Sequence, residues 1–249
     1  MPLVTTPALV LHTFPYGETS KIARLLTPDH GVQSVIAKGA LRPRSKFGAR
    51  LQVLSDGTAQ LYLKVNRDLH TLAEFEVTKL RAELAQDVAR FAAGAALAEL
   101  IMRSAPAEPH PEIYDCAVAQ LDRLVQVQED GRDAAALAAL WAVVGALGFA
   151  PSLGACARDG SELPDGRVAF SVSDGGFLCK ACARGGATTS LDASDRSVLE
   201  RLVAAHGEPV GELSVRHAEA HRRLLLRFVE RHVAEGRELR ALAFWQELS

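Results

Sequence analysis

The sequence predicts an α+β protein, in which a small N-terminal β-barrel is followed by a helical domain with a short cysteine-bearing insert. Three observations support this fold class. Residues 1–80 contain about five short β-prone segments separated by turn residues. From residue 83 onward the chain is rich in alanine and leucine at helical spacing. Residues 152–190 interrupt the helical pattern and hold three of the four cysteines. We therefore expect a domain at 1–80 and a second at 81–249, interrupted by an insert at 152–190.

Length and composition agree with a folded protein of this kind. The 249 residues suffice for two domains with a sizeable core, and 48% of them are hydrophobic. We see no apolar run of the roughly 18 residues that a membrane span needs. The first residues lack the charged start and long apolar stretch of a signal peptide, so we expect a cytoplasmic protein. In that compartment the cysteines are expected to be reduced or metal-bound.

The N-terminal strands follow from β-branched runs and turns. A first strand is expected at Ala8–Phe14, with a turn at Pro15–Gly17. The next segment fits a strand or a helix, but the turn after it favours a hairpin. The remaining strands and a turn at Asn66–Asp68 complete the pattern, with the later segments at 20–26, 32–36, 58–65 and 69–77. A five-stranded OB-type barrel is the economical way to close the edges of so small a sheet.

A basic loop follows the third strand and breaks at Gly39 and Pro43. Between residues 21 and 50 there are seven basic residues and one acid, Asp29. These candidate DNA-binding residues are Lys21, Arg24, Lys38, Arg42, Arg44, Lys46 and Arg50. A small number of basic residues on a loop would usually indicate only a solvent-exposed hairpin tip. Five basic residues in thirteen, with no acid among them, favour a polyanion-binding site.

The charge of the chain is unevenly divided. Residues 1–80 carry ten Lys/Arg and six Asp/Glu; of the 28 and 30 in the whole chain, 18 and 24 remain for 81–249. The net charge is therefore +4 in the first part and −6 in the second, although the whole chain is at −2. Only the first third is suited by charge to a polyanion. Phe47 and Tyr62 are candidates for stacking on bases, but we expect both to pack in the barrel.

The helical domain begins with an alanine-rich helix at Phe91–Met102, ended by Pro106 and Pro109. Pro111 suits the start of a second helix that runs to Val127. A third helix at 134–147 is apolar nearly all round, which predicts a buried position. We expect Cys116 to be a small buried side chain and Trp141 to belong to the core.

The insert carries a candidate metal site. Cys179 and Cys182 have the Cys-x-x-Cys spacing at which two thiolates reach one metal from a tight turn. The first half of the site contains Cys156 and, where a second pair would place cysteine, Asp159. A carboxylate oxygen also ligates zinc, so the set predicts a structural zinc held by three thiolates and a carboxylate. A site that has lost the metal is the alternative.

Three further helices are expected at 194–206, 214–233 and 239–248. In the middle one, Leu225, Phe228 and Val229 share a face. Four arginines fall on roughly the opposite face, and we call them the arginine stripe: Arg216, Arg223, Arg227 and Arg231. Most such stripes are merely solvated, and a secondary contact with an anion is the alternative.

The basic loop, Lys38 to Gln52, resembles the signature loop of the bacterial RecO recombination mediators. The strands before it, the helices after it and the cysteine insert are also similar to that family, over essentially the whole chain. The resemblance implies an OB barrel on a helical domain with a zinc-ribbon-like insert. It implies binding of single- and double-stranded DNA and annealing of complementary strands. It also implies work with RecR to load RecA onto DNA coated by single-stranded-DNA-binding protein, whose acidic, apolar tail would be a partner. Asp159 departs from the cysteine that zinc-bearing members usually show.

Two other classes stay open on the sequence alone. One is a protein-interaction adaptor whose basic loop binds an acidic partner. The other is a zinc-dependent hydrolase. We find no GxxxxGK[ST], no H-x-E zinc signature and no GxSxG, so the prediction is a protein that is not an enzyme.

Overall fold

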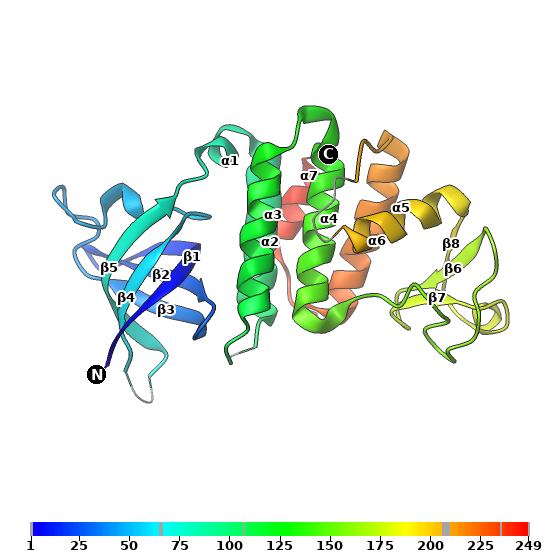
Figure 1. Cartoon of the computed structure of the whole chain (residues 1–249), viewed down its shortest axis with the longest axis horizontal. Helices are drawn as coiled ribbons and strands as arrows, with labels where there is room; N and C mark the ends of the chain where they lie inside the picture. Colours follow the sequence, from blue (N-terminus) through cyan, green and yellow to red (C-terminus); the bar gives the residue numbers. More distant parts are fainter. Residues whose placement is uncertain (1, 65–66, 107, 206–209, 235, 249) are drawn as a thin grey trace. The chain divides into compact units, whose positions relative to one another are not determined.

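A computed structural model describes residues 2–64, 67–106, 108–205, 210–234 and 236–248 (Figure 1). The chain divides into two compact units, residues 1–125 and 126–249. In the first unit, five strands form a closed barrel in the order β1-β2-β3-β5-β4. Their bounds are β1 Leu3–Tyr16, β2 Ser20–Thr27, β3 Gly31–Ala37, β4 Asp56–Tyr62 and β5 Leu69–Lys79. All neighbours are antiparallel except β3 and β5, which are parallel. The predicted OB-type barrel is confirmed.

The long first strand is buried at its middle and exposed at its C-terminal end. Ala8 and Val10 belong to the barrel core. The pairing of β1 with β2 shifts register between Val10 and His12. Beyond that irregularity no residue of the strand is buried, and His12, Phe14 and Tyr16 are exposed. The strand therefore presents two aromatic rings to solvent next to the turn into β2.

Several local predictions need correction. β1 continues through Pro15, which pairs with Lys21, so the turn starts at Gly17 and not at Pro15. Phe47 is buried in the barrel as expected, but Tyr62 is exposed, so the prediction that it packs inside was wrong. It lies at the end of β4, opposite exposed Leu3. The predicted strand end at residue 65 and part of the turn at 66–68 lie outside the described residues.

Three helices complete the first unit: α1 Ala82–Gln86, α2 Val88–Ser104 and α3 Pro111–Gln126. The Asp87 carboxylate accepts the backbone N–H groups of Ala89 and Arg90 and so caps α2. Pro111 occupies the first position of α3, as predicted. Cys116 is half-buried and not fully buried, and burial raises the pKa of its thiol to about 11.

A buried arginine joins the barrel to α3 within this unit. Arg81 donates to Asp56 at the start of β4 (2.7 Å) and to the Leu54 carbonyl (2.8 Å). It also donates to Asp122 of α3 (2.8 Å). Its guanidinium is almost fully buried, and the two carboxylates offset the free-energy cost of removing that charge from water.

The second unit is built on α4 Arg132–Val144, which continues into a π-helical turn at Gly145–Phe149. Every side chain from Ala134 to Val144 is buried. Trp141 is 1% exposed and meets Phe228 of α6 edge-on, which confirms its place in the core. The remaining helices are α5 Ala193–Ala204, α6 Val215–His232 and α7 Arg240–Glu247. They confirm the three C-terminal helices, although His206, the predicted end of the first, lies outside the described residues.

The expectation that no stretch is apolar enough for a membrane span was too strict. The helical stretch Glu129–Phe149 is long and apolar enough by composition. Most of it is buried inside the protein, with α5 and α6 packed against α4. A core helix passes the same test of length and composition, and the burial of α4 identifies it as one.

The insert contains a three-stranded sheet in the order β7-β6-β8. Its strands are β6 Val168–Ser171, β7 Gly176–Leu178 and β8 Thr189–Leu191. Phe170 and Phe177 are fully buried and meet edge-on. Phe170 also lies 6.2 Å from Phe228 of α6, measured between ring centroids. The hairpin β6–β7 therefore packs on the helical core through its aromatic residues.

Candidate nucleic-acid interface and candidate metal centre

The basic loop between β3 and β4 is fixed to the barrel by its apolar residues. Ala40, Phe47 and Leu51 are all buried in the barrel core. The Leu41 N–H donates to the Thr19 carbonyl (2.8 Å), which ties the loop to the β1–β2 turn. Phe47 and Leu51 directly follow Lys46 and Arg50, so these two anchors fix the backbone beside a basic residue. The cations are thus displayed on an ordered support and not on a free tail.

The seven predicted residues fall into two groups. Five are exposed on the loop, and no carboxylate among the described residues pairs with them: Lys38, Arg42, Arg44, Lys46 and Arg50. Lys21 and Arg24 are half-buried on β2. Arg24 donates to Ser34 of β3 (2.5 Å), and burial, with a smaller contribution from nearby Arg103, lowers the pKa of its guanidinium. The exposed five are the better placed to meet phosphate.

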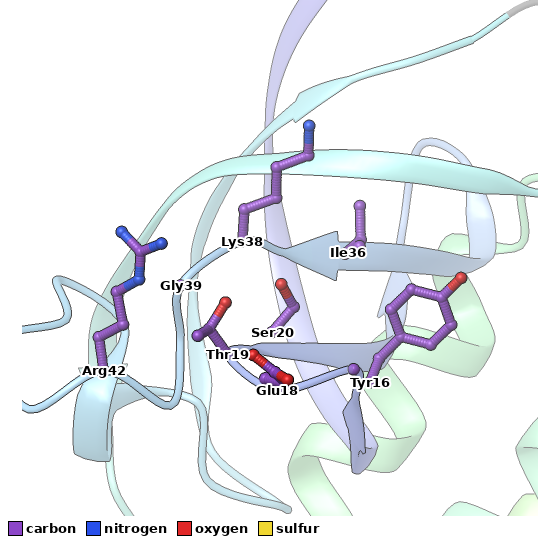
Figure 2. Close-up of a pocket in the computed structure, with 9 residues that line it drawn as sticks. Tyr16, Glu18, Thr19, Ser20, Ile36, Lys38, Gly39 and Arg42 are labelled. Atoms are coloured by element: carbon purple, nitrogen blue, oxygen red, sulfur yellow. The ribbon is translucent and has the colours of Figure 1, made fainter.

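A shallow groove of about 420 Å³ lies where the β1–β2 turn meets the end of β3 (Figure 2). Lys38 and Arg42 line it on the loop side, and Tyr16 lines it from the end of β1. Tyr16 is 51% exposed, so one ring face is open to a ligand. Glu18 also lines the groove and would repel a phosphate near it, which leaves the edge with Lys38 and Arg42 for the anion.

Tyr16 is the site residue that the sequence did not reveal. The sequence predicted that residue 16 lies in the turn after the first strand, but β1 extends to Tyr16, and its ring lines the groove. The Tyr16 ring and the two cations line the same groove, and aromatic rings combined with cations are typical of surfaces that bind single strands. The arrangement suits stacking on a base with neutralisation of the adjacent phosphate.

The four predicted metal ligands are brought together. The carboxylate oxygen of Asp159 and the sulfur atoms of Cys156, Cys179 and Cys182 all lie within 4.8 Å of one another. Four ligands arranged tetrahedrally around zinc with 2.3 Å bonds are about 3.8 Å apart, so the cluster has the right size for one ion. The set can therefore hold a metal ion.

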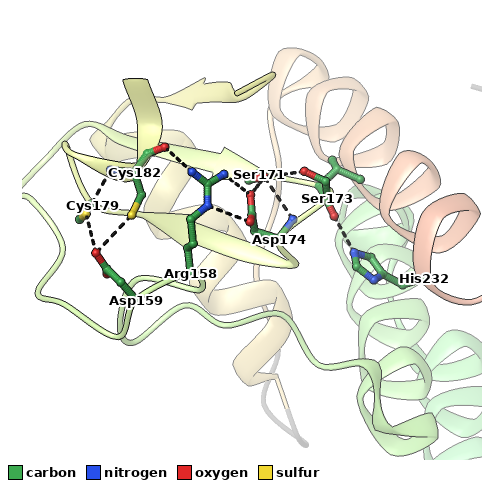
Figure 3. Close-up of polar contacts among 9 residues, drawn as sticks. Arg158, Asp159, Ser171, Ser173, Asp174, Cys179, Cys182 and His232 are labelled. Atoms are coloured by element: carbon green, nitrogen blue, oxygen red, sulfur yellow. Dashed lines mark hydrogen bonds and ion pairs between the residues drawn. The ribbon is translucent and has the colours of Figure 1, made fainter. Parts of the chain in front are cut away.

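Two tight turns present these ligands. In the first, the Cys156 N–H donates to the Ser161 carbonyl (2.9 Å) and the Gly160 N–H to the Cys156 carbonyl (2.8 Å). In the second, the Cys182 N–H donates to the Cys179 sulfur (3.4 Å). A backbone N–H in this position stabilises a thiolate. Ser161 donates its N–H (3.0 Å) and its hydroxyl (2.6 Å) to one oxygen of Asp159. The other oxygen faces the thiols (Figure 3).

Electrostatics in the cluster favour a bound cation. Hydrogen bonds from Ser161 hold the pKa of Asp159 well below its usual range, so this carboxylate is ionised. Hydrogen bonds from Ser161 and from the Cys182 N–H lower the pKa of Cys179 to about 7. Its neighbour Cys182 donates to Asp159, which raises the pKa of that thiol to about 12. The Cys182 thiol cannot easily ionise beside the Asp159 carboxylate. A bound metal ion would replace the proton between them and stabilise both negative charges.

The arginine stripe on α6 differs from the basic loop in its partners. Arg216 pairs with Asp195 of α5 (3.0 Å), and Arg223 pairs with Glu219 (3.7 Å). Arg227 donates to the Thr189 hydroxyl (3.0 Å). At least two of its charges are thus offset locally, which makes the stripe a weaker anion site than the loop.

Comparisons with known proteins agree across the chain. A family model described as "Recombination protein O N terminal" matches residues 1–81, and one described as "Recombination protein O C terminal" matches residues 85–241. Curated relatives from Anaeromyxobacter sp. (strain K) and Anaeromyxobacter dehalogenans (strain 2CP-C) are each 33% identical over 255 residues. The alignments cover 100% of this chain and 98% of each relative. A third, from A. dehalogenans (strain 2CP-1 / ATCC BAA-258), is 34% identical over 96% of this chain and 94% of its own length. All three are named DNA repair protein RecO.

Proposed function

The chain belongs to the RecO family of DNA repair and recombination proteins, and from this we propose that it is a recombination mediator that binds and anneals DNA. It binds single- and double-stranded DNA and brings complementary strands together. With RecR it helps to load RecA onto DNA coated by single-stranded-DNA-binding protein. The observation that carries this proposal is the group of five exposed cations, without carboxylate partners among the described residues, on a loop fixed to the barrel.

Annealing requires no covalent chemistry in this mechanism. Two phosphate backbones repel each other, and a surface with several unpaired cations offsets that repulsion while it holds both strands. The exposed loop residues supply the charge, and Tyr16 in the groove supplies a ring on which a base stacks. Binding of this kind depends strongly on salt and weakly on sequence. The protein is therefore proposed to act without catalysis, in the cytoplasm at the nucleoid.

The metal centre is proposed to be a structural zinc site. Cys156, Asp159, Cys179 and Cys182 would hold the ion, which would fix two turns of the insert to each other. Four protein ligands would fill the tetrahedral coordination of the zinc, so no coordination position would stay open for water or substrate. We propose that the division into a barrel at 1–80 and a helical domain at 81–249 with an insert at 152–190 follows the two family models.

The partners follow from family membership together with charge. RecR and the acidic, apolar tail of single-stranded-DNA-binding protein are the proposed protein partners. The tail requires apolar contacts with a cation nearby, and the helical part carries both: exposed Phe244 on α7 and several surface arginines.

A strand-annealing assay tests the function. Two complementary oligonucleotides with a fluorophore and a quencher are mixed with and without the full-length protein, at several salt concentrations. We expect faster annealing that declines as salt rises. No acceleration, together with no salt-dependent binding to mixed-sequence single-stranded DNA, would favour the adaptor class. Nucleotide or nucleic-acid turnover that stops on addition of a chelator would instead favour the zinc-dependent hydrolase.

A further inference from the structure

A single arginine connects the two halves of the metal cluster. Arg158 lies between Cys156 and Asp159 in the first turn. Its Nη1 donates to the carbonyl of Cys182 in the second turn (2.9 Å). Its Nε and Nη2 donate to the two oxygens of Asp174, at 3.0 and 2.8 Å (Figure 3). One guanidinium therefore bonds at once to the second ligand turn and to the β6–β7 turn.

The β6–β7 turn that carries Asp174 is itself ordered. The Ser171 hydroxyl donates to the Asp174 carboxylate, and the Gly175 N–H donates to the Ser171 carbonyl (3.0 Å). Gly175 has a φ of +77°, a left-handed conformation that favours glycine and closes the turn. The bonds from Arg158, reinforced by Ser171, lower the pKa of Asp174 to about 2, so the carboxylate is ionised and accepts both arms of the guanidinium.

The same turn is bonded to the C-terminal end of α6. His232 Nε2 lies 2.5 Å from the carbonyl oxygen of Val172 (Figure 3). A carbonyl only accepts, so Nε2 carries the proton and donates. The His232 ring also stacks against Phe228, at 4.5 Å between centroids, and Phe228 is part of the buried core. A series of polar contacts, linked by the backbone of the β6–β7 turn between Ser171 and Asp174, thus connects the metal cluster with α6.

We propose that Arg158 is the positioning residue of the metal centre, and that metal binding is coupled through Asp174 and the β6–β7 turn to His232 and the end of α6. This inference rests on the proposed zinc site. The Cys182 carbonyl and Asp174 are both within reach of Arg158 when the two ligand turns are held together, as zinc would hold them. Coupling of this kind is reciprocal: contacts that favour the metal-bound arrangement are favoured in turn by the metal.

The chemistry of the contact requires a guanidinium. Its fork matches a carboxylate with two parallel N–H groups and leaves a third nitrogen for the Cys182 carbonyl. A lysine ammonium is a point charge and cannot make the paired contact. Outer contacts that orient metal ligands are typically worth about 10–100-fold in metal affinity.

Zinc affinity, measured by competition with a chromophoric chelator on the full-length protein, tests the proposal. We expect Arg158→Ala to weaken zinc binding about 10–100-fold and Arg158→Lys to weaken it less. His232→Ala, at the far end of the series, should weaken it by about 5-fold. Arg184→Ala removes an exposed arginine from the same insert and should leave the affinity unchanged. The double variant Arg158→Ala/Asp174→Asn should be no weaker than Arg158→Ala alone.

Hydrogen exchange separates coupling from general loosening. In the parent protein, removal of zinc should speed exchange of the amides of residues 229–234 at the end of α6. In Arg158→Ala this zinc-dependent difference should disappear, while the metal-free proteins exchange alike. The inference would be wrong if Arg158→Ala bound zinc as tightly as Arg184→Ala, or if exchange at the end of α6 did not depend on zinc. Either result would still be compatible with the zinc site. A parent protein that binds no zinc would overturn both.

Discussion

The basic loop gives the sharpest test of the proposed DNA binding. Simultaneous replacement of Arg42, Arg44 and Lys46 by Ala removes three cations that are exposed and have no carboxylate partner among the described residues. Each cation that contacts phosphate contributes about 0.7 to the slope of log K against log salt for single strands, and about 0.9 for duplex. The slope should therefore become shallower by about 2 for single-stranded DNA and about 3 for duplex.

The same slope predicts the loss of affinity. If the electrostatic contribution vanishes near 1 M salt, a slope lower by 2 means about 100-fold weaker binding at 0.1 M and about 25-fold at 0.2 M. The loss should be similar for all sequences, because phosphate contacts carry no base information. The replaced side chains are exposed, so unfolding free energy should change by less than about 0.5 kcal/mol.

Fluorescence anisotropy with labelled oligonucleotides, titrated at five or more salt concentrations, measures both quantities. The matched control is Arg223→Ala/Arg227→Ala/Arg231→Ala, which removes the same charge from the arginine stripe on α6. We expect the control to keep the parent slope. If the loop variant keeps the parent slope and affinity while the stripe variant loses them, the DNA site lies on α6 and the assignment to the loop is wrong.

Four further predictions follow from individual side chains. Tyr16→Ala should weaken single-strand binding by about 1–3 kcal/mol at an unchanged salt slope, with Tyr16→Phe as the conservative control; equal anisotropy curves for all three proteins would exclude stacking. Elemental analysis should find about one zinc per chain, retained by Asp159→Cys and lost from Cys179→Ser with little change in DNA binding; retention by Cys179→Ser would contradict the ligand set. His221 is 1% exposed, neither ring nitrogen has a hydrogen-bond partner among the described residues, and burial lowers its pKa to about 4. Its unfolded pKa is near 6.5, so the unfolded state binds more protons as pH falls and stability is lost between about pH 6.5 and 4, by about 3 kcal/mol. Urea unfolding of His221→Leu should lack that share of the pH dependence, and identical pH profiles would refute this. Arg81→Met leaves Asp56 buried without its partner and should lower the free energy of unfolding by about 3–5 kcal/mol; a loss below about 1 kcal/mol would show that the carboxylates find other partners.

Period and composition were enough to predict the barrel, its five strands and most helix bounds. Alternation marks a strand wherever one face is buried, and Pro111 marks the start of α3 because a helix does not need an N–H at that position. The irregularity within β1 was missed for an equally physical reason. A register shift after Val10 inserts an extra residue, and no local signal separates that bulge from a strand of regular alternation. Pro15 was interpreted as a turn, but it lies within β1 opposite Lys21.

The clustering of the four candidate metal ligands was predicted from the sequence because the Cys-x-x-Cys spacing suits one ion. The contacts around them were not, since Arg158, Asp174 and His232 follow no period and meet only in the folded unit. For the same reason Arg81 gave no sign of its role, because its partners Asp56 and Asp122 lie 25 and 41 residues away. Ligand sets are local patterns, whereas the groups that hold them in place depend on tertiary packing.

The distribution of carboxylates decides between the two arginine-rich surfaces. The sequence already favoured the loop, because its five basic residues have no acid among them, and the structure adds the partners of each cation. On α6, Asp195 and Glu219 lie within 4 Å of Arg216 and Arg223, so an incoming phosphate must compete with groups already in place. On the loop no described acid is paired with Arg42, Arg44 or Lys46, and their full charge is available. Each phosphate contact should therefore release more free energy on the loop than on the stripe, and on this ground we propose that a nearly neutral chain binds DNA through one short segment.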